Sequence, residues 1–225
     1  MTDVTGPEDG IEAVIFDLDG VLVESEEIWD EARHTLALEH DLAWPESAQH
    51  DMMGMSSSEW SRYMHERVGL PETPDEISAE VVNRLEDLYW RHLPLLEGAV
   101  EAVERMAKRF RLGLASSSNR PIIELVLELA AIADRFEVTV SSEEVERGKP
   151  SPDVYLEALR RMKVAPARAA AIEDSTNGLL AAHAAGMLVV AVPSPVFPPR
   201  PDALAVADVV IDSLAELTPE TVLVF

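Results

Sequence analysis

The 225-residue chain contains no cysteine, which excludes disulfide bonds and thiolate metal ligands. It also lacks any uninterrupted run of about 18 apolar residues, so no membrane-spanning helix is expected. The first ten residues, MTDVTGPEDG, are polar and acidic, and no basic stretch followed by an apolar one predicts a signal peptide. We therefore expect a cytoplasmic protein.

Basic residues are scarce as well. Lysine and arginine total 18 against 42 aspartates and glutamates, a formal net charge of −24. This excess argues against nucleic acids and anionic membranes as partners, because both would be repelled. It would also repel an anionic substrate, so a site for one needs local cations. Only three lysines occur, Lys108, Lys149 and Lys163, and each of them merits inspection.

Hydrophobic patterning predicts an α/β chain. The apolar run at 11–16 is typical of a strand buried on both faces, whereas residues 24–93 show helical spacing and no strand pattern. Ser151 and Pro152 predict a helix start, as N-cap and first helical residue, and Gly186 predicts a left-handed helix end. Helices alternate with further short apolar runs, which predict strands at 112–115, 137–140, 169–172, 188–192 and 206–211.

Strands that alternate with helices form a parallel sheet with helices on both faces. We therefore predict a Rossmann-like, doubly wound core from residues 1–23 and 94–225, with an all-helical cap domain inserted at 24–93. The length fits one such core with a smaller insertion, and we expect a monomer. Segments 21–24 and 93–97 join the two parts, and we expect them to act as hinges.

Polar and charged residues follow four of the predicted strands. Asp17 and Asp19 come after the first strand, Lys149 after the third, and Glu173 and Asp174 after the fourth. Open α/β sheets bind ligands outside the carboxyl ends of their strands, so these residues are expected at one edge. Behind the second strand lies a polar run, Ser116, Ser117, Ser118 and Asn119.

Electrostatic repulsion limits what such an edge can bind. Two unit charges about 4 Å apart repel by roughly 4 kcal/mol at an effective dielectric constant near 20, so four carboxylates cannot all stay ionised without a cation. Mg²⁺, which prefers oxygen ligands, suits them best. Lysine, serine hydroxyls and N–H groups at a helix start add an anion site. These parts suit phosphoryl transfer to Asp17, with Asp19 as acid and base.

The same residues resemble, in order, the four motifs of the haloacid dehalogenase superfamily: Asp17-Leu18-Asp19-Gly20-Val21, Ser116, Lys149-Pro150 and Glu173-Asp174. The resemblance spans nearly the whole chain and implies an α/β core with a helical cap. It implies that Asp17 is the nucleophile and that Asp19 is the acid and base. It also implies that Ser116 and Lys149 hold the phosphoryl group.

The resemblance also implies a metal site and a substrate site. Asp17 and Asp174 would bind Mg²⁺ through their carboxylates, and Asp19 would bind it through its backbone oxygen. Glu173 would lie close by. A small phosphorylated substrate would meet the polar residues at the adjoining helix start and the cap loop that faces the site in relatives. These candidate substrate-binding residues are Ser117, Ser118, Asn119 and Gly54.

Departures from individual relatives narrow the function. Haloacid dehalogenases lack the second aspartate of the DxD motif, so Asp19 argues against dehalogenation. Phosphonatases need a cap lysine, but Lys108 is the first lysine of the chain and lies beyond the cap. β-Phosphoglucomutases carry a histidine where Trp29 aligns and a phosphate-binding arginine where Ser57 aligns. Without that arginine the cap has little to hold a second phosphate.

The stretch VESEEIWDEA looks most like that of sugar-phosphate phosphatases such as 2-deoxyglucose-6-phosphate phosphatase. We therefore expect a Mg²⁺-dependent phosphatase that acts on a small phosphorylated metabolite, a sugar phosphate, through an aspartyl-phosphate. A phosphomutase of the β-phosphoglucomutase type and an inactive scaffold that serves as an interaction protein are alternatives. Trp29 is either apolar filler of the cap or part of the pocket wall.

Overall fold

The computed structural model describes residues 10–223. Residues 1–9, which hold most of the polar N-terminal stretch, and residues 224–225 lie outside the described part, so the predicted core is traced from residue 10 onward. Along residues 10–223, no helix combines the length and the hydropathy that crossing a membrane requires.

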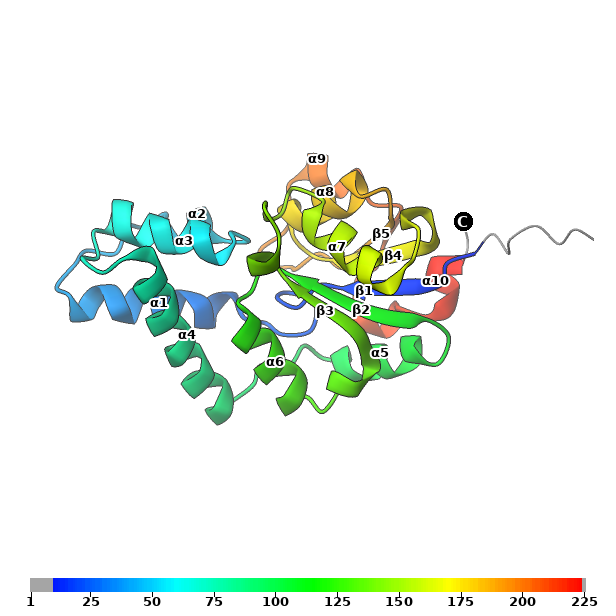
Figure 1. Ribbon diagram of the computed structural model, residues 1–225, viewed down its shortest axis with the longest axis horizontal. Helices are drawn as coiled ribbons and strands as arrows, with labels where there is room; N and C mark the ends of the chain where they lie inside the picture. The colour runs from blue at the N-terminus through cyan, green and yellow to red at the C-terminus, as the bar shows by residue number, and fades with distance from the viewer. Residues whose placement is uncertain (1–9, 224–225) are drawn as a thin grey trace, which may run out of the picture.

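A six-stranded sheet lies at the centre of the core (Figure 1), and all neighbouring strands are parallel. The order β3-β2-β1-β4-β5-β6 confirms the predicted doubly wound sheet. Its winding reverses between β1 and β4, which is where such sheets bind ligands. The strands are β1 (Ala13–Phe16), β2 (Arg111–Ser116), β3 (Phe136–Ser141), β4 (Ala169–Glu173), β5 (Leu188–Ala191) and β6 (Val209–Val210).

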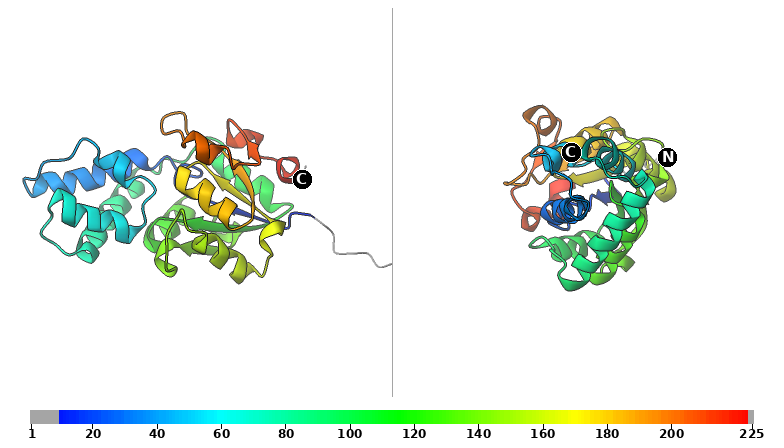
Figure 2. Two further views of the ribbon diagram at one scale, coloured as in Figure 1. Left: turned by 90° about the horizontal axis from the view of Figure 1, so that it is seen from above. Right: turned by 90° about the vertical axis from the view of Figure 1, so that its left-hand side faces the viewer.

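Side chains of β1 alternate between two apolar cores, as the period of a strand requires. Val14 and Phe16 belong to a cluster with α5 and α6, whereas Ala13 and Ile15 belong to one with α7 and α8. Helices therefore cover both faces of the sheet (Figure 2). They are α5 (Ala99–Ala107), α6 (Arg120–Leu129), α7 (Asp153–Met162) and α8 (Thr176–Ala184), followed by the short α9 (Pro201–Leu204) and α10 (Pro219–Leu223).

Residues 24–93 contain helices and no strand, as the sequence predicts. These helices lie together beyond one end of the sheet, at the left of Figure 1. Leu36 and Leu85, from two different helices, belong to one buried cluster that holds them together. The helices are α1 (Glu26–Glu39), α2 (Ala48–Met52), α3 (Ser57–Tyr63), a π-helical turn (Met64–Val68) and α4 (Pro74–Arg91).

The two segments predicted as hinges lie side by side. Val23 and Leu95 form an antiparallel bridge, and the backbone N–H of Leu96 donates to the carbonyl of Leu22 at 3.0 Å. The N–H of Glu24 also donates to the carbonyl of Pro94 at 2.9 Å. A paired two-strand connection of this kind can bend as a unit, and the hinge motion itself stays a prediction.

Two local expectations are wrong in detail. Helix α7 begins at Asp153 with Pro152 as its N-cap residue, because the hydroxyl of Ser151 donates instead to the Asp153 carboxylate at 2.6 Å. The strand predicted at 206–211 shortens to β6, because turn hydrogen bonds that follow α9 take up its first residues. The left-handed conformation of Gly186, with φ of 78°, is confirmed.

The start of α4 offers a test of how the cap helices are stabilised. The Thr73 hydroxyl accepts from the Glu76 N–H at 3.4 Å, and the Glu76 carboxylate accepts from the Thr73 N–H at 2.9 Å. We predict that Thr73→Ala lowers the free energy of unfolding by about 1 kcal/mol in urea denaturation, because alanine lacks the hydroxyl that accepts from the Glu76 N–H and donates to the Glu76 carboxylate at 2.8 Å. Thr73→Ser should keep most of this free energy, because serine retains the hydroxyl. Equal losses of stability in the two variants would contradict this account.

Candidate active site

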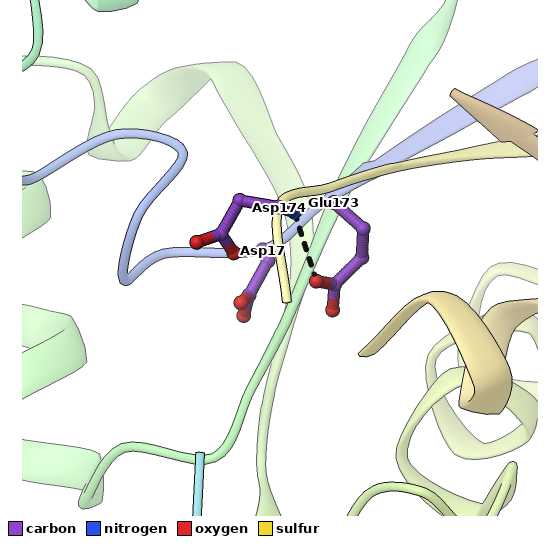
Figure 3. Close-up of side chains that lie close together, drawn as sticks. All are labelled: Asp17, Glu173 and Asp174. Carbon is purple, nitrogen blue, oxygen red and sulfur yellow. Dashed lines mark hydrogen bonds between the residues drawn. The ribbon is translucent and has the colours of Figure 1, made fainter. Parts of the chain in front are cut away.

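Three carboxylates meet at the point where the sheet reverses its winding. Asp17 directly follows β1, while Glu173 ends β4 and Asp174 comes next. One carboxylate oxygen of each lies within 4.8 Å of the others, and all three residues are buried (Figure 3). They meet because β1 and β4 are neighbouring parallel strands in register, so that their carboxyl ends coincide.

Lys149 is the cation of this cluster. Its Nζ lies 2.5 Å from Glu173 Oε1 and 2.9 Å from Asp17 Oδ1, and the side chain is buried. The hydroxyl of Tyr155 donates to the same Glu173 oxygen at 2.8 Å, and Lys149 Nζ lies 5.0 Å from the centre of the Tyr155 ring. Lys149 is thus held between the two strand ends, where the sequence predicts it.

One lysine does not balance three buried carboxylates. Burial raises the pKa of Asp17 to about 8, an effect that Lys149 opposes and that Glu173 strengthens. Burial and then Glu173 and Asp17 raise the pKa of Asp174 well above its usual range. Although burial disfavours its charged form, the two carboxylates raise the pKa of Lys149. At neutral pH the cluster therefore holds protons that a further cation would displace.

The donor set fits a hard divalent cation. It consists of carboxylate oxygens, the ligand type that Mg²⁺ prefers. Asp174 Oδ1 is buried and, among the residues that the structure describes, has no hydrogen-bond partner. A buried acceptor without a donor is costly, and coordination would satisfy it. Asp17, Asp174 and Glu173 are thus the residues that could hold a metal ion.

The carboxylate of Asp19 points to different neighbours. It accepts hydrogen bonds from the hydroxyls of Ser25 and Ser118, both at 2.5 Å, and from Trp29 Nε1 at 3.2 Å. Ser116 Oγ lies 3.5 Å from it. Asp19 therefore joins the end of β2 to the start of α1. Of the two expectations for Trp29, this hydrogen bond favours contact with the site over a role as apolar filler alone.

The remaining residues after β2 divide between the site and the cap. The Ser116 hydroxyl accepts from the backbone N–H of Ser118 at 2.9 Å, and Ser117 Oγ is buried without a hydrogen-bond partner. The Asn119 amide donates to Glu143 at 2.7 Å and to Ser78 of α4 at 3.1 Å, so it links core and cap. The roles of Ser117, Ser118 and Asn119 in substrate binding stay predictions.

Cap residues approach the core at two further points. A Cβ on Gly54, which has φ of 70°, would lie 3.6 Å from Asn177 Nδ2 at the start of α8. The Ser57 hydroxyl donates to Glu143 at 3.2 Å. Sequence reasoning missed Ser25, Asn177 and Glu143, since nothing in their local pattern distinguishes them from helix caps or surface polar residues.

Two glycines make room for the carboxylates. Gly20, with φ of 77°, lies so close to Asp174 that a Cβ there would be 2.0 Å from its Oδ2. A Cβ on Gly178 would lie 1.7 Å from Glu173 Oε1. Glu173 Oε2 in turn accepts from the N–H groups of Asp174 and Ser175 at 3.1 and 3.2 Å, at the positive end of α8.

This fold and geometry match a known family. A family model described as a haloacid dehalogenase-like hydrolase matches residues 11–186. The chain therefore belongs to the haloacid dehalogenase-like hydrolases, and the resemblance seen in its motifs is confirmed.

Individual relatives lie within the same family. Hexitol phosphatase B of Escherichia coli strain K12 is 34% identical over 219 residues, which cover 94% of this chain and 96% of the relative. The structure of CbbY from Rhodobacter sphaeroides in complex with phosphate gives a TM-score of 0.83 at 29% identity, covering 94% of this chain and 99% of the other. The structure of β-phosphoglucomutase from Clostridium difficile gives a TM-score of 0.80 at 25% identity, and the match covers 93% of this chain and 94% of the other. The expected enzyme class, a phosphoric monoester hydrolase, is confirmed.

The space that Gly178 leaves can be tested. An alanine in place of a helical glycine usually stabilises by about 1 kcal/mol. We predict that Gly178→Ala instead lowers the free energy of unfolding by roughly 1–3 kcal/mol, because its Cβ would overlap the Glu173 carboxylate. Chemical denaturation monitored by circular dichroism measures this.

The matched control for that substitution is Gly10→Ala, because a Cβ there meets no atom of residues 10–223 within 4 Å. It should leave stability almost unchanged. A Gly178→Ala variant as stable as the parent would contradict the close approach of α8 to Glu173.

Proposed function

We propose that this protein is a Mg²⁺-dependent phosphatase that hydrolyses a small sugar phosphate through an aspartyl-phosphate on Asp17. The observation that carries the proposal is the buried contact of Asp17 with Lys149, at 2.9 Å, inside a group of three carboxylates at the sheet's reversal point. A nucleophilic carboxylate beside a fixed cation is what attack on a phosphoryl group requires.

Mg²⁺ would be held by Asp17 and Asp174 and by the backbone oxygen of Asp19, with Glu173 close by. When bound, it would neutralise the negative charge of the phosphoryl oxygens. The buried Asp174 Oδ1 without a hydrogen-bond partner supports this assignment.

The chain's own residues account for the remaining steps. Asp17 attacks phosphorus, while Lys149 and Ser116 hold the phosphoryl group. Asp19 protonates the leaving oxygen and then takes a proton from the water that hydrolyses the aspartyl-phosphate. Its hydrogen bonds from Ser25 and Trp29 support this role, since they fix the orientation of the carboxylate.

The substrate lies between core and cap in this proposal. The core is formed by residues 1–23 and 94–225, of which 10–23 and 94–223 are described, and the cap by residues 24–93. Ser117 and Ser118 contact the substrate, and Gly54 and Asn119 border its site. The hexitol phosphatase relative supports a sugar or sugar alcohol as the phosphorylated group.

We favour a phosphatase over a phosphomutase, although a β-phosphoglucomutase is among the similar structures. The position at which mutases carry a phosphate-binding arginine is Ser57, whose hydroxyl donates to Glu143 at 3.2 Å. A second phosphate would meet a carboxylate there rather than a cation. The contacts of Asp17 with Lys149 and of Asp19 with Ser118 argue for a working enzyme rather than an inactive scaffold.

Substitution of the two aspartates tests the proposed chemistry. We predict that Asp17→Asn releases no phosphate above background from an aryl phosphate in the presence of Mg²⁺. Asp19→Asn should lower kcat by roughly 10²- to 10⁴-fold, the usual contribution of a general acid and base. The exposed Asp212→Asn, as the matched control, should retain full activity.

Either substituted enzyme at near-parental activity would refute the assigned roles. A parent protein that interconverts hexose phosphate isomers when primed with a bisphosphate, without net release of phosphate, would establish the mutase instead.

The pKa of Asp17 predicts how Mg²⁺ affects stability. In the metal-free protein this pKa is raised from 3.8 to about 8. The stability that protonated Asp17 contributes is therefore complete below about pH 4 and is lost as the pH rises to about 8. Mg²⁺ binds the deprotonated form, so its stabilising effect should grow over the same range. We expect Mg²⁺ to raise Tm more at about pH 8.5 than at about pH 5.5.

Differential scanning fluorimetry of the parent and of Asp174→Asn measures this effect. The substituted protein should lose most of the gain in Tm, and Asp212→Asn should keep it. A gain that is equal at both pH values would contradict the raised pKa.

A further inference from the structure

Arg33 lies inside the cap, one helical turn beyond a residue of the site. Its side chain is 6% exposed, and its guanidinium carbon lies 4.7 Å from the ring centre of Trp29 and 4.9 Å from that of Trp60. Trp29 in turn donates to the Asp19 carboxylate. The guanidinium is therefore separated from the catalytic carboxylate by a single indole ring.

This guanidinium lacks the partners that a buried arginine normally has. Arg33 Nε is fully buried and, in the described part of the chain, has no hydrogen-bond partner. Across residues 10–223, no carboxylate oxygen lies within ion-pair distance, 4.0 Å, of any Arg33 nitrogen. Guanidinium carries five N–H donors, and a buried donor left unpaired is costly. The two tryptophan rings alone do not satisfy these donors.

Two more buried polar atoms near Arg33 have no hydrogen-bond partner among the residues that the structure describes. They are Tyr89 Oη of α4 and Asp30 Oδ1 of α1. Both residues interact electrostatically with Arg33, as does the half-buried Glu26. The region thus offers an N–H donor, a carboxylate acceptor and a hydroxyl that can act as either, beside two indole rings.

The charges decide which ligand suits this region. Asp30 and, where it is ionised, Glu26 attract the Arg33 charge and would repel a second phosphate; burial raises the pKa of Glu26 to about 7. Neutral hydroxyl groups can accept from a guanidinium and donate to a carboxylate at the same time. The mixture of donors and acceptors is therefore complementary to a polyol and not to an anion.

We propose that Arg33, with Tyr89 and Asp30, is a specificity-determining site for the hydroxyl groups at the uncharged end of a monophosphorylated sugar or sugar alcohol. This inference rests on the proposed phosphatase function. Ser57 and Ser78 of the cap both contact the core, so the structure has its cap closed. When the substrate binds, its hydroxyls replace the missing hydrogen-bond partners of Arg33.

The test compares two substrates that both carry one phosphate, of which only one carries hydroxyl groups that could contact Arg33. Steady-state kinetics with Mg²⁺ would use hexitol 6-phosphate, which carries hydroxyls along its whole chain, and phenyl phosphate, which carries none. Arg33→Met should lower the ratio of their kcat/KM values by roughly 10- to 100-fold, the value of hydrogen bonds to a charged group, mainly through KM for the hexitol phosphate. The exposed Arg62→Met is the matched control and should leave the ratio unchanged.

Tyr89→Phe covers the case in which Arg33→Met does not fold, because it removes a single oxygen from the same region. It should lower the ratio by roughly 2- to 10-fold, whereas Tyr63→Phe, on a more exposed tyrosine, should not. Equal losses on both substrates would assign Arg33 a merely structural role and overturn the proposal, as would an unchanged ratio in Arg33→Met or Tyr89→Phe.

Two results concern the ligand class. The proposal that Arg33 binds the uncharged end of the substrate would be overturned if kcat/KM of the parent enzyme were more than about tenfold higher for a hexitol bisphosphate than for the monophosphate. A parent without activity on any phosphate ester would instead refute the proposed function, so the two failures are distinguishable.

Discussion

Repulsion among three buried carboxylates is the constraint on which this site depends. Asp17, Glu173 and Asp174 are brought together by the register of two parallel strands, and within the described part of the chain Lys149 alone forms ion pairs with them. Burial first, and then the charges of Glu173 and Asp19, raise the pKa of Asp17 to about 8, so the cluster without metal retains protons at neutral pH. A divalent cation turns the same crowding into a site that can accept a phosphoryl group.

The two aspartates of the DxD motif differ in environment although one residue separates them. Asp17 faces Lys149 within the sheet's edge, whereas Asp19 faces the hydroxyls of Ser25 and Ser118 and the indole of Trp29. Differences in environment can give two neighbouring carboxyl groups different roles, and in the proposed mechanism one is the nucleophile and the other the acid and base. Two of the Asp19 partners begin the cap, so in that mechanism the position of the cap would affect the acid–base step.

The sequence was sufficient for the sheet and for the acidic cluster, because the ends of consecutive parallel strands must meet. Asp17, Lys149, Glu173 and Asp174 were predicted on that basis. Contacts that depend on how the cap sits were not predictable. Local patterns do not encode that the amide of Asn119 contacts the cap, that Trp29 reaches Asp19, or that Arg33 is buried without an ion pair. These follow from packing between segments far apart in the chain.

The central claim is that Mg²⁺ displaces protons from this buried carboxylate cluster. Isothermal titration calorimetry at about pH 7, in two buffers with different ionisation enthalpies, measures this most directly. We predict binding of one Mg²⁺ per chain with release of protons to the buffer, because the pKa of Asp17 in the metal-free protein is about 8. Binding without proton release, or no binding at all, would contradict the account.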